Sequence, residues 1–435
     1  MGMDVIIEWM DVGHDMTFGY ANTLLEYLSL FAQTVGIDGR DFDDVLRDCL
    51  DLNERRERTF DRLFHDIGES LGGRPLALYG LPSQVTQSVL RLFYDRGLRA
   101  ACLCDPRGVG GCSEFSGLRV VAPQTLGKDF ANATVVVCQR TGDGANAMGV
   151  LTSLGFSRHQ IFPWEWVDLI IKANPTILFD PSKPLNPSKQ LQAHLSQYSW
   201  AYSLFEDDLS KRTVLAWLRK SLCGTPMDTP SPCEKYFEDG YIALGGREIF
   251  VDGGANSGES AAAFIAQVES AKGGYAHIYS FEPDSVHYAQ ALENTSKYPN
   301  VTVVQKGLWD SDTELRFLEQ GTLGHSSSFS IIPAELPGTI VASVPVTSLD
   351  TFFGGVPESD WPTFIKMDIE GAEKEALEGA TDTIRRTKPK MAICAYHKPE
   401  DLYVLPQTIL KMRNDYRFAL RQHAPELHEI ILYAV

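Results

Sequence analysis

The chain has 435 residues, which at roughly 150 residues per domain suggests about three domains. It carries 57 Asp and Glu against 39 Lys and Arg, a formal net charge of −18. Because this surplus of negative charge repels phosphate backbones, we expect no general binding to nucleic acid or acidic membranes. Hydrophobic residues make up 44% and charged residues 22%, which excludes the disordered and fibrous classes.

The amino terminus and the cysteines indicate a cytoplasmic protein. No apolar run approaches the roughly 18 residues of a membrane span. Residues 1–8 have no basic segment and are interrupted by acids, so we expect no secretory signal, and position six lacks the Ser or Thr of a myristoylation signal. The eight cysteines are scattered without a Cys-x-x-Cys pair, which favours reduced core thiols over a zinc site.

Three segments precede the part of the chain that carries motifs. Residues 1–72 are polar and acidic with apolar residues at helical spacing, which predicts a helical cap or partner surface. Residues 73–165 alternate strand-like and helical stretches, which predicts a parallel sheet with crossover helices. Residues 166–235 are rich in proline and are predicted to form a connector. The expected elements are strands at 76–80, 99–105 and 134–138 and helices at 84–96 and 208–220.

The first turn of segment 73–165 keeps Gly80 as the single glycine of the three in a dinucleotide fingerprint, and Asp105 stands where a ribose-binding acid is expected. The segment resembles the nucleotide-sugar- or dinucleotide-binding Rossmann-like domain that precedes some sugar-modifying enzymes. Leu81 adds a side chain, and Pro82 lacks an N–H, where a pyrophosphate needs close backbone approach. We therefore expect a structural or acceptor-docking role rather than tight NAD binding.

Residues 236–435 are predicted to form a second α/β sheet whose strands end on polar residues. A buried strand at 248–252 precedes a glycine-rich turn and a helix from about Glu259. The next strand ends at Glu282. Ligands bind at such carboxyl ends in an open α/β sheet. Further strands are expected at 301–304, 364–368 and 391–396 and near Tyr416 and Ile430.

The glycine-rich turn and Glu282 together predict a nucleoside ligand. Gly254 and Gly258 let backbone N–H groups approach a ligand, and the following helix N-terminus adds a positive dipole. Asp252 is placed to accept from a ligand ammonium group. Glu282 follows on the next strand, where a carboxylate is the usual acceptor for the 2′- and 3′-hydroxyls of a ribose. These residues do not distinguish a dinucleotide from S-adenosylmethionine.

Five motifs are spread over about 200 residues of this block. They read VDGGANSG at 251–258, FEPD at 281–284, VTSLD at 346–350, IKMDIEGAE at 365–373 and YHKPEDL at 396–402. The first departs from Gly-x-Gly-x-x-Gly and resembles the first motif of S-adenosylmethionine-dependent methyltransferases. Together the five resemble one branch of these enzymes, the FkbM family.

The resemblance implies a Rossmann-like methyltransferase fold, S-adenosylmethionine as methyl donor and O-methylation of a sugar- or polyketide-type hydroxyl. Gly307 and Leu308, just past the third strand, would lie against adenine, and Asp310 or Asp312 would accept from its amino group. The expected cofactor-binding residues are Asp252, Gly253, Gly254, Asn256, Gly258, Glu282, Gly307 and Leu308.

His397 is the expected general base, because a hydroxyl must lose its proton as it accepts a methyl group. It follows one predicted strand, and Asp368 ends a neighbouring one and is expected to support it. Glu370 completes the predicted catalytic set, and Lys366 is expected to pair with Asp368, Glu370 or Glu373. Two alternatives stay open: these acids also suit a helix N-terminus, and Asp368, Glu370 and His397 together suit a divalent ion, although we expect no metal.

The sequence thus predicts an α/β protein with a C-terminal Rossmann-like class I methyltransferase sheet, preceded by a smaller Rossmann-like α/β domain and an N-terminal helical segment. We expect an S-adenosylmethionine-dependent O-methyltransferase acting on a carbohydrate or glycoconjugate hydroxyl. The alternatives are a catalytically silent methyltransferase fold that recognises a nucleotide sugar and an NAD-dependent sugar oxidoreductase. The stretch HSSS at 325–328 is predicted as a substrate loop or an ordinary polar turn. Neither the acceptor nor the oligomeric state follows from the sequence.

Overall fold

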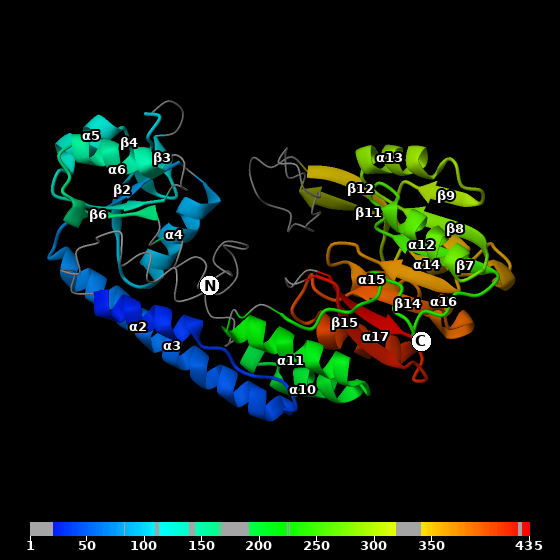
Figure 1. The fold of residues 1–435 in the computed structure, drawn as a ribbon. Coiled ribbons are helices and arrows are strands. Elements are labelled where there is room, and N and C mark those ends of the chain that lie inside the picture. The colour runs from blue at the N-terminus through cyan, green and yellow to red at the C-terminus, as the bar shows by residue number, and fades with distance from the viewer. Residues whose placement is uncertain are drawn as a thin grey trace. The chain divides into compact units, whose positions relative to one another are not determined.

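The computed structural model describes residues 21–81, 83–108, 113–138, 144–164, 167, 191–223, 225, 227–318, 341–424 and 429–435 (Figure 1). The chain divides into two compact units, one of residues 1–193 with 218–225 and one of residues 194–217 with 226–435. The four segments expected from the sequence stay a prediction. Among the described residues, no helix combines the length and apolar character needed to cross a membrane.

The first unit begins with helices α2 (Ala21–Ala32) and α3 (Phe42–Leu71). Helix α3 starts at the N-cap Asp41, whose side chain accepts from the Asp44 N–H, and ends at Gly72 in the left-handed conformation. Its apolar face, which includes Val45 and Leu63, is buried. The helical segment predicted at the N-terminal end of the chain is confirmed over these residues.

A six-stranded sheet follows in the order β3-β4-β2-β1-β5-β6. All its pairs are parallel except β3 with β4, and β1 and β5 are buried along their whole length, as in a sheet covered on both faces. Its strands are β1 (Leu76–Tyr79), β2 (Ala100–Cys104), β3 (Glu114–Phe115), β4 (Leu118–Val121), β5 (Thr134–Val137) and β6 (Ile161–Phe162). The connecting helices are α4 (Gln84–Asp95), α5 (Pro123–Asp129), α6 (Gly144–Ser153) and the 3₁₀ turn η1 (Arg158–Gln160).

The second unit is built on a seven-stranded sheet in the order β15-β16-β14-β13-β7-β8-β9. Strand β16 is antiparallel to both its neighbours, and the other pairs are parallel. The strands are β7 (Glu248–Gly253), β8 (Tyr275–Phe281), β9 (Val301–Val304), β13 (Phe364–Met367), β14 (Lys390–Cys394), β15 (Phe418–Gln422) and β16 (Ile430–Ala434). Each corresponds to a strand predicted from the sequence, so the α/β fold class is confirmed.

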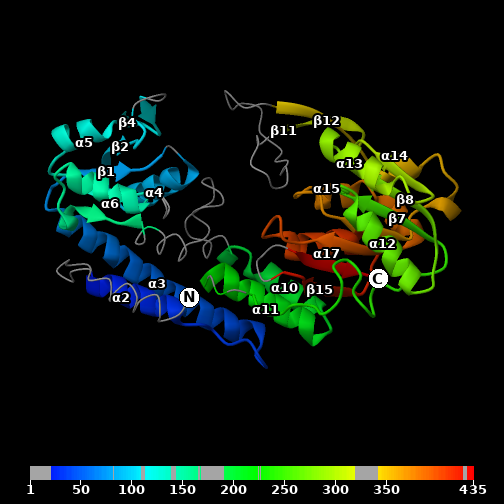
Figure 2. The same ribbon diagram turned by 45° about the horizontal axis from the view of Figure 1, so that its top comes forward.

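Helices and a small second sheet complete this unit. Helices α10 and α17 contact each other and lie side by side in both views (Figure 1 and Figure 2). The helices are α10 (Leu195–Leu204), α11 (Asp208–Cys223, which the border between the units crosses), α12 (Glu259–Ser270), α13 (Ser285–Thr295), α14 (Leu349–Phe353), η2 (Glu358–Asp360), α15 (Glu373–Glu378), α16 (Thr381–Thr387) and α17 (Asp401–Met412). The small sheet, which the sequence analysis did not predict as such, has the order β10-β12-β11 and consists of β10 (Gly307–Leu308), β11 (Thr313–Leu318) and β12 (Val341–Thr347).

The strand order of the large sheet reverses between β7 and β13. From β7 the chain proceeds to β8 on one side, and it later returns through β13 on the other. Beneath this point, Phe250, Phe264 and Phe364 form an aromatic cluster in which the Phe250 ring stacks on the other two, with centroids 4.4 and 5.0 Å away. Because ligands in open α/β sheets bind at the carboxyl ends beside such a reversal, the fold directs attention to the ends of β7 and β13.

Gly254, directly after β7, is confined by the neighbouring strand end. Its φ of +76° lies in the left-handed region, and its N–H donates to the Phe281 carbonyl oxygen at 3.0 Å. A Cβ at this position would lie 1.9 Å from the Asp368 carbonyl oxygen. Only glycine therefore fits where the two strand ends meet.

We predict that Gly254→Ala lowers the free energy of unfolding by at least about 2 kcal/mol, because the clash is with backbone and adds to the strain of a positive φ. The control is Gly246→Ala, where an added Cβ meets nothing within 4 Å. Urea unfolding of the two variants measures the difference. Equal midpoints would contradict the crowding described for Gly254.

Candidate functional site

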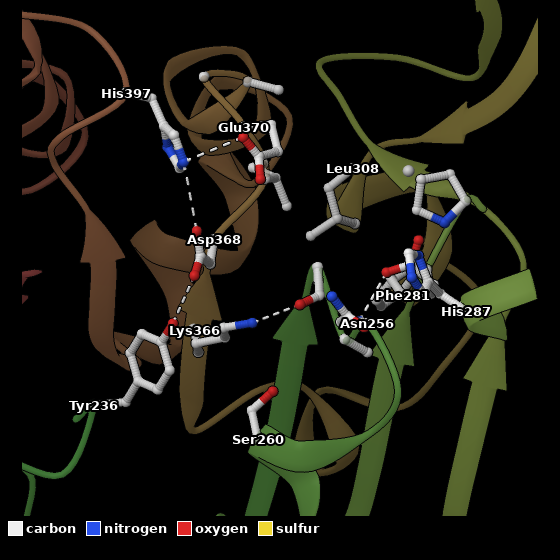
Figure 3. Close-up of a pocket in the computed structure, with 18 of the residues that line it drawn as sticks. Tyr236, Asn256, Ser260, Phe281, His287, Leu308, Lys366, Asp368, Glu370 and His397 are labelled. Atoms are coloured by element: carbon white, nitrogen blue, oxygen red, sulfur yellow. Dashed lines mark hydrogen bonds and ion pairs between the residues drawn. The ribbon is translucent and has the colours of Figure 1, made fainter. Parts of the chain in front are cut away.

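A pocket of about 760 Å³ opens at the carboxyl ends of β7, β8 and β13 (Figure 3). This volume lies within the roughly 300–1,000 Å³ typical of small-molecule sites. Of the predicted site residues, the pocket is lined by Gly254, Asn256, Glu282, Gly307, Leu308, Asp368, Glu370 and His397. Asp252, Gly253 and Gly258 lie outside the lining.

The glycine-rich turn places Asn256 against Glu282. Asn256 has a φ of +49°, and its N–H donates to Glu282 Oε2 at 2.8 Å. The Asp284 N–H donates to Glu282 Oε1 at 2.9 Å. Burial raises the pKa of Glu282, which is 6% exposed, and the two backbone N–H donors oppose this rise. Each oxygen retains acceptor capacity for a hydroxyl in the pocket.

Asp252 is fully buried behind this turn. Lys366 Nζ lies 2.9 Å from Asp252 Oδ1, and the Ser260 hydroxyl donates to the same carboxylate at 2.9–3.0 Å. Lys366 also donates to the carbonyl oxygens of Gly253 and Gly254, at 3.1 and 2.7 Å. The expectation that Lys366 pairs with one of the acids after β13 is therefore wrong, because the strand register places Lys366 directly opposite Asp252.

Asp252, Gly253 and Gly258 therefore lie behind the residues that line the pocket and stabilise them. Asp252 holds the turn through Lys366, and its contact with a ligand ammonium group stays a prediction. Gly253 lies against Leu308, since a Cβ there would approach Leu308 Cδ1 to 2.8 Å. Gly258, with a φ of +89°, is the N-cap of α12, and a Cβ there would meet Thr295 Cγ2 at 2.9 Å. A side chain at Gly258 would also be strained by its positive φ, whereas one at Gly253 would require Leu308 to shift.

Gly307 and Leu308 form β10 at the edge of the pocket. Leu308 is 3% exposed and supplies an apolar wall. Neither acid proposed for the adenine amino group lines the pocket. Asp312 Oδ1 instead accepts from the Thr347 hydroxyl at 2.7 Å, and Asp310 Oδ1 from the Ser311 hydroxyl at 2.5 Å.

Asp368, just after β13, is held by two tyrosines. The Tyr236 hydroxyl donates to Oδ2 at 2.7 Å, and the Tyr396 hydroxyl donates to Oδ1 at 3.0 Å. Burial favours the neutral acid, but the Lys366 and Lys235 cations and the Tyr236 hydroxyl keep the pKa of Asp368 well below its usual range. Asp368 is therefore an ionised carboxylate, and each of its two oxygens already accepts a hydrogen bond from a tyrosine hydroxyl.

His397 faces three carboxylates. Its Nε2 lies 3.6 Å from Asp368 Oδ1 and 3.7 Å from Glu370 Oε2. Its Nδ1 lies 3.0 Å from Glu373 Oε1, as an ion pair rather than an aligned hydrogen bond. Burial alone would lower the pKa of His397, but the carboxylates, Glu373 foremost, raise it to about 9. The imidazole is therefore mostly protonated at neutral pH.

Glu370 occupies a strained backbone position at the pocket. Its φ is +58°, in the left-handed region, and Gly371 follows with +96°. A non-glycine residue held there costs free energy, and such strain clusters at functional sites. Burial also raises the pKa of the Glu370 carboxyl. The strained turn presents this carboxylate to the pocket beside His397.

Several residues at the site were not given a role by the sequence analysis. Tyr236 and Lys235 lie at the expected border of the connector, outside every motif. Ser260 lies on α12 beyond the first motif. Tyr396 and Glu373 lie within the motifs, so the sequence pointed to them as site residues. Their partners, Asp368 and His397, follow only from the folded sheet.

Two expectations concern a metal and a loop. Over the residues that the structure describes, no group of three or more His, Cys, Asp or Glu side chains is arranged to hold a metal ion. The alternative of a divalent ion at Asp368, Glu370 and His397 thus gains no support. The predicted loop at 325–328 lies outside the described residues.

Comparison with known proteins identifies the domain that carries this pocket. Residues 252–420 match the family model of the methyltransferase FkbM domain. The resemblance to FkbM methyltransferases is confirmed over these residues, and it supports S-adenosylmethionine as the cofactor expected from the sequence. The Rossmann-like domain expected at 73–165 stays a prediction.

Solved structures are similar in fold. A crystal structure of the methyltransferase FkbM from Methylobacillus flagellatus KT matches with a TM-score of 0.51 and 19% identity, over 96% of this chain and 100% of that one. A more distant likeness, with a TM-score of 0.28 and 12% identity, joins 44% of this chain to 67% of Aeropyrum pernix fibrillarin, solved with bound S-adenosyl-L-methionine. Comparison with curated proteins gives no match.

Proposed function

We propose that the second unit is an S-adenosylmethionine-dependent O-methyltransferase acting on a hydroxyl of a sugar or glycoconjugate. The observation that carries the proposal is the Glu282 carboxylate, buried beside the glycine-rich turn in a domain that matches the FkbM methyltransferase model. The carbohydrate class of the acceptor is taken from the family resemblance alone.

The pocket residues suit the parts of this cofactor. Glu282 presents two carboxylate oxygens to the ribose hydroxyls, and its backbone contacts to Asn256 and Asp284 hold it in place. Gly307 and Leu308 offer an apolar wall to adenine. When bound, the cofactor supplies an electrophilic methyl group on a sulfonium.

We assign the acceptor side of the pocket to Glu370, Tyr396 and His397, which are among the residues that line it. Methyl transfer requires the acceptor hydroxyl to lie in line with the methyl group and to lose its proton. His397 Nε2 faces this side and takes the proton once the ring is neutral. Asp368, held by Tyr236 and Tyr396, stabilises the imidazolium that then forms.

Ligands retained by the purified protein test the proposal directly. Mass spectrometry of the native protein should detect S-adenosylmethionine or its demethylated product. Retention of a nucleotide sugar or of NAD, without either of these, would overturn the proposal in favour of a binding module or an oxidoreductase.

We predict that Glu282→Ala weakens S-adenosylmethionine binding by about 2–3 kcal/mol, roughly 30- to 150-fold, because a charge-assisted acceptor pair is lost. Titration calorimetry on folded protein measures this. Glu293→Ala, which removes an exposed carboxylate from the nearby helix α13, is the matched control. Equal affinities for Glu282→Ala and wild type would contradict the ribose assignment.

We predict that turnover rises with pH up to about 9, because His397 with a pKa of about 9 accepts a proton only when neutral, and about 1% of it is neutral at pH 7. His397→Ala should lower turnover by about 10²- to 10⁴-fold, abolish this rise and leave cofactor affinity nearly unchanged.

Single-turnover methyl transfer to an acceptor found by screening sugars and sugar nucleotides is the measurement, with His277→Ala on β8 as the control. A His397→Ala enzyme with wild-type turnover and an unchanged pH profile would rule out the base role and leave positioning alone to carry the reaction.

A further inference from the structure

Glu373 is a buried carboxylate that has no role in the proposed reaction. It begins α15 and is 1% exposed. Its Oε1 accepts from the Ile369 N–H at 2.9 Å and lies 3.0 Å from His397 Nδ1. Its Oε2 has no hydrogen-bond partner among the described residues. Because burying a carboxylate with an unsatisfied oxygen is costly, a nearby positive charge is needed to offset it.

Glu373 lies on the Nδ1 side of the His397 ring, at 3.0 Å, in an ion pair that is not aligned as a hydrogen bond. Nδ1 points toward α15, and Nε2 points toward the pocket, where Asp368 and Glu370 lie 3.6 and 3.7 Å away (Figure 3). A histidine held through Nδ1–H presents its Nε2 as the atom that exchanges protons. Glu373 is the nearest carboxylate to either ring nitrogen.

Asp368, the acid expected from the sequence to support His397, is less suited to orient it. Its oxygens accept from the Tyr236 and Tyr396 hydroxyls at 2.7 and 3.0 Å, both shorter than its 3.6 Å distance to His397. It also lies on the Nε2 side, where the acceptor hydroxyl must approach. An acid on that side contributes charge but does not hold the opposite nitrogen.

We propose that Glu373 is the positioning residue for His397, fixing the Nδ1–H form of the ring and aiming Nε2 into the pocket. The catalytic consequence rests on the proposed function, whereas the placement of the ring does not. Glu373 itself touches neither the pocket nor a reacting atom. It acts through His397 alone.

Other charged groups also face His397 from the elements packed around it. Asp368 and Glu370 follow β13, Asp401 begins α17, and Lys398 is the next residue in the chain. The acids on this list still favour the imidazolium when Glu373 is neutralised. Removal of the Glu373 charge should therefore lower the pKa of His397 without returning it fully to 6.5.

The experiment is NMR of the full chain with ¹⁵N-labelled histidine, titrated from pH 5 to 11, with the His397 signals assigned by their loss in His397→Gln. In wild type, the neutral ring should carry its proton on Nδ1. Glu373→Gln should lower the His397 pKa by more than one unit, at least a tenfold change in its protonation equilibrium. Glu373→Asp, which retains the charge, should largely restore the wild-type value.

Glu378→Gln is the matched control, because it removes a carboxylate from the same helix that pairs with Lys374 instead. It should leave the His397 titration unchanged. A neutral wild-type ring protonated on Nε2, or a Glu373→Gln pKa equal to that of wild type, would overturn the inference. The wild-type measurement decides the matter even if Glu373→Gln does not fold.

Enzyme kinetics separate this inference from the proposed function. If both hold, the pH at which turnover rises should move down in Glu373→Gln together with the pKa seen by NMR. If the NMR changes appear but His397→Ala keeps wild-type turnover, the placement by Glu373 stands and the base role of His397 fails.

Discussion

The buried ion pair between Asp252 and Lys366 is the interaction on which the site depends. It joins the two strands at which the sheet reverses, and neither side chain is more than 3% exposed. Removing one partner of such a pair leaves a buried charge and typically costs about 3–5 kcal/mol. Here the cost of burial is offset by Ser260 and by the carbonyl oxygens of Gly253 and Gly254.

The geometry of the turn follows from that pair. Lys366 binds the carbonyl oxygens of Gly253 and Gly254, and the N–H groups on the other side of the same peptides, those of Gly254 and Ala255, donate to the Phe281 carbonyl oxygen at 3.0 Å. The next residue of the turn, Asn256, donates its N–H to Glu282, whose carboxylate is buried, held by backbone donors and still able to accept hydroxyls. The same close approach of strand ends brings the Asp368 carbonyl against Gly254 and leaves no space for a side chain there.

A second constraint is the excess of carboxylates around His397. Asp368, Glu370 and Glu373 lie within 3.7 Å of its ring nitrogens and hold it as a cation at neutral pH. A histidine kept in this state is a stronger base when it does lose its proton, but it loses it rarely. Under the proposed function, in which His397 is the base, the reactive neutral form would be rare but strongly basic, and turnover would be expected to rise toward alkaline pH.

Much of this architecture could be predicted from local patterns. Apolar runs and turn residues predict the three strands β1, β2 and β5 of the first sheet and the strands of the large sheet, because a strand in a parallel sheet is buried on both faces and its sequence shows this without reference to the rest of the chain. The short strands β3, β4 and β6 were not predicted. Each of Asn256, Glu282, Asp368 and His397 lies at or just after the end of a predicted strand, so their spacing along the chain predicts that they meet at one edge of the sheet. The partner of Lys366 was misassigned because sequence proximity favours the acids that follow it, whereas strand register selects Asp252, which is 114 residues away.

The sequence by itself therefore determined the α/β class, the strand ends that carry polar residues and the resemblance to FkbM methyltransferases that the family model matches over residues 252–420. Only the tertiary structure decided which charges meet: Lys366 with Asp252, Tyr236 with Asp368, and Glu373 with His397. The physical reason is that secondary structure depends on neighbouring residues, whereas a pKa and a hydrogen bond depend on atoms within a few ångströms in space. Tyr236 lies outside every motif, and it meets Asp368 only because the fold brings the segment before β7 to the end of β13.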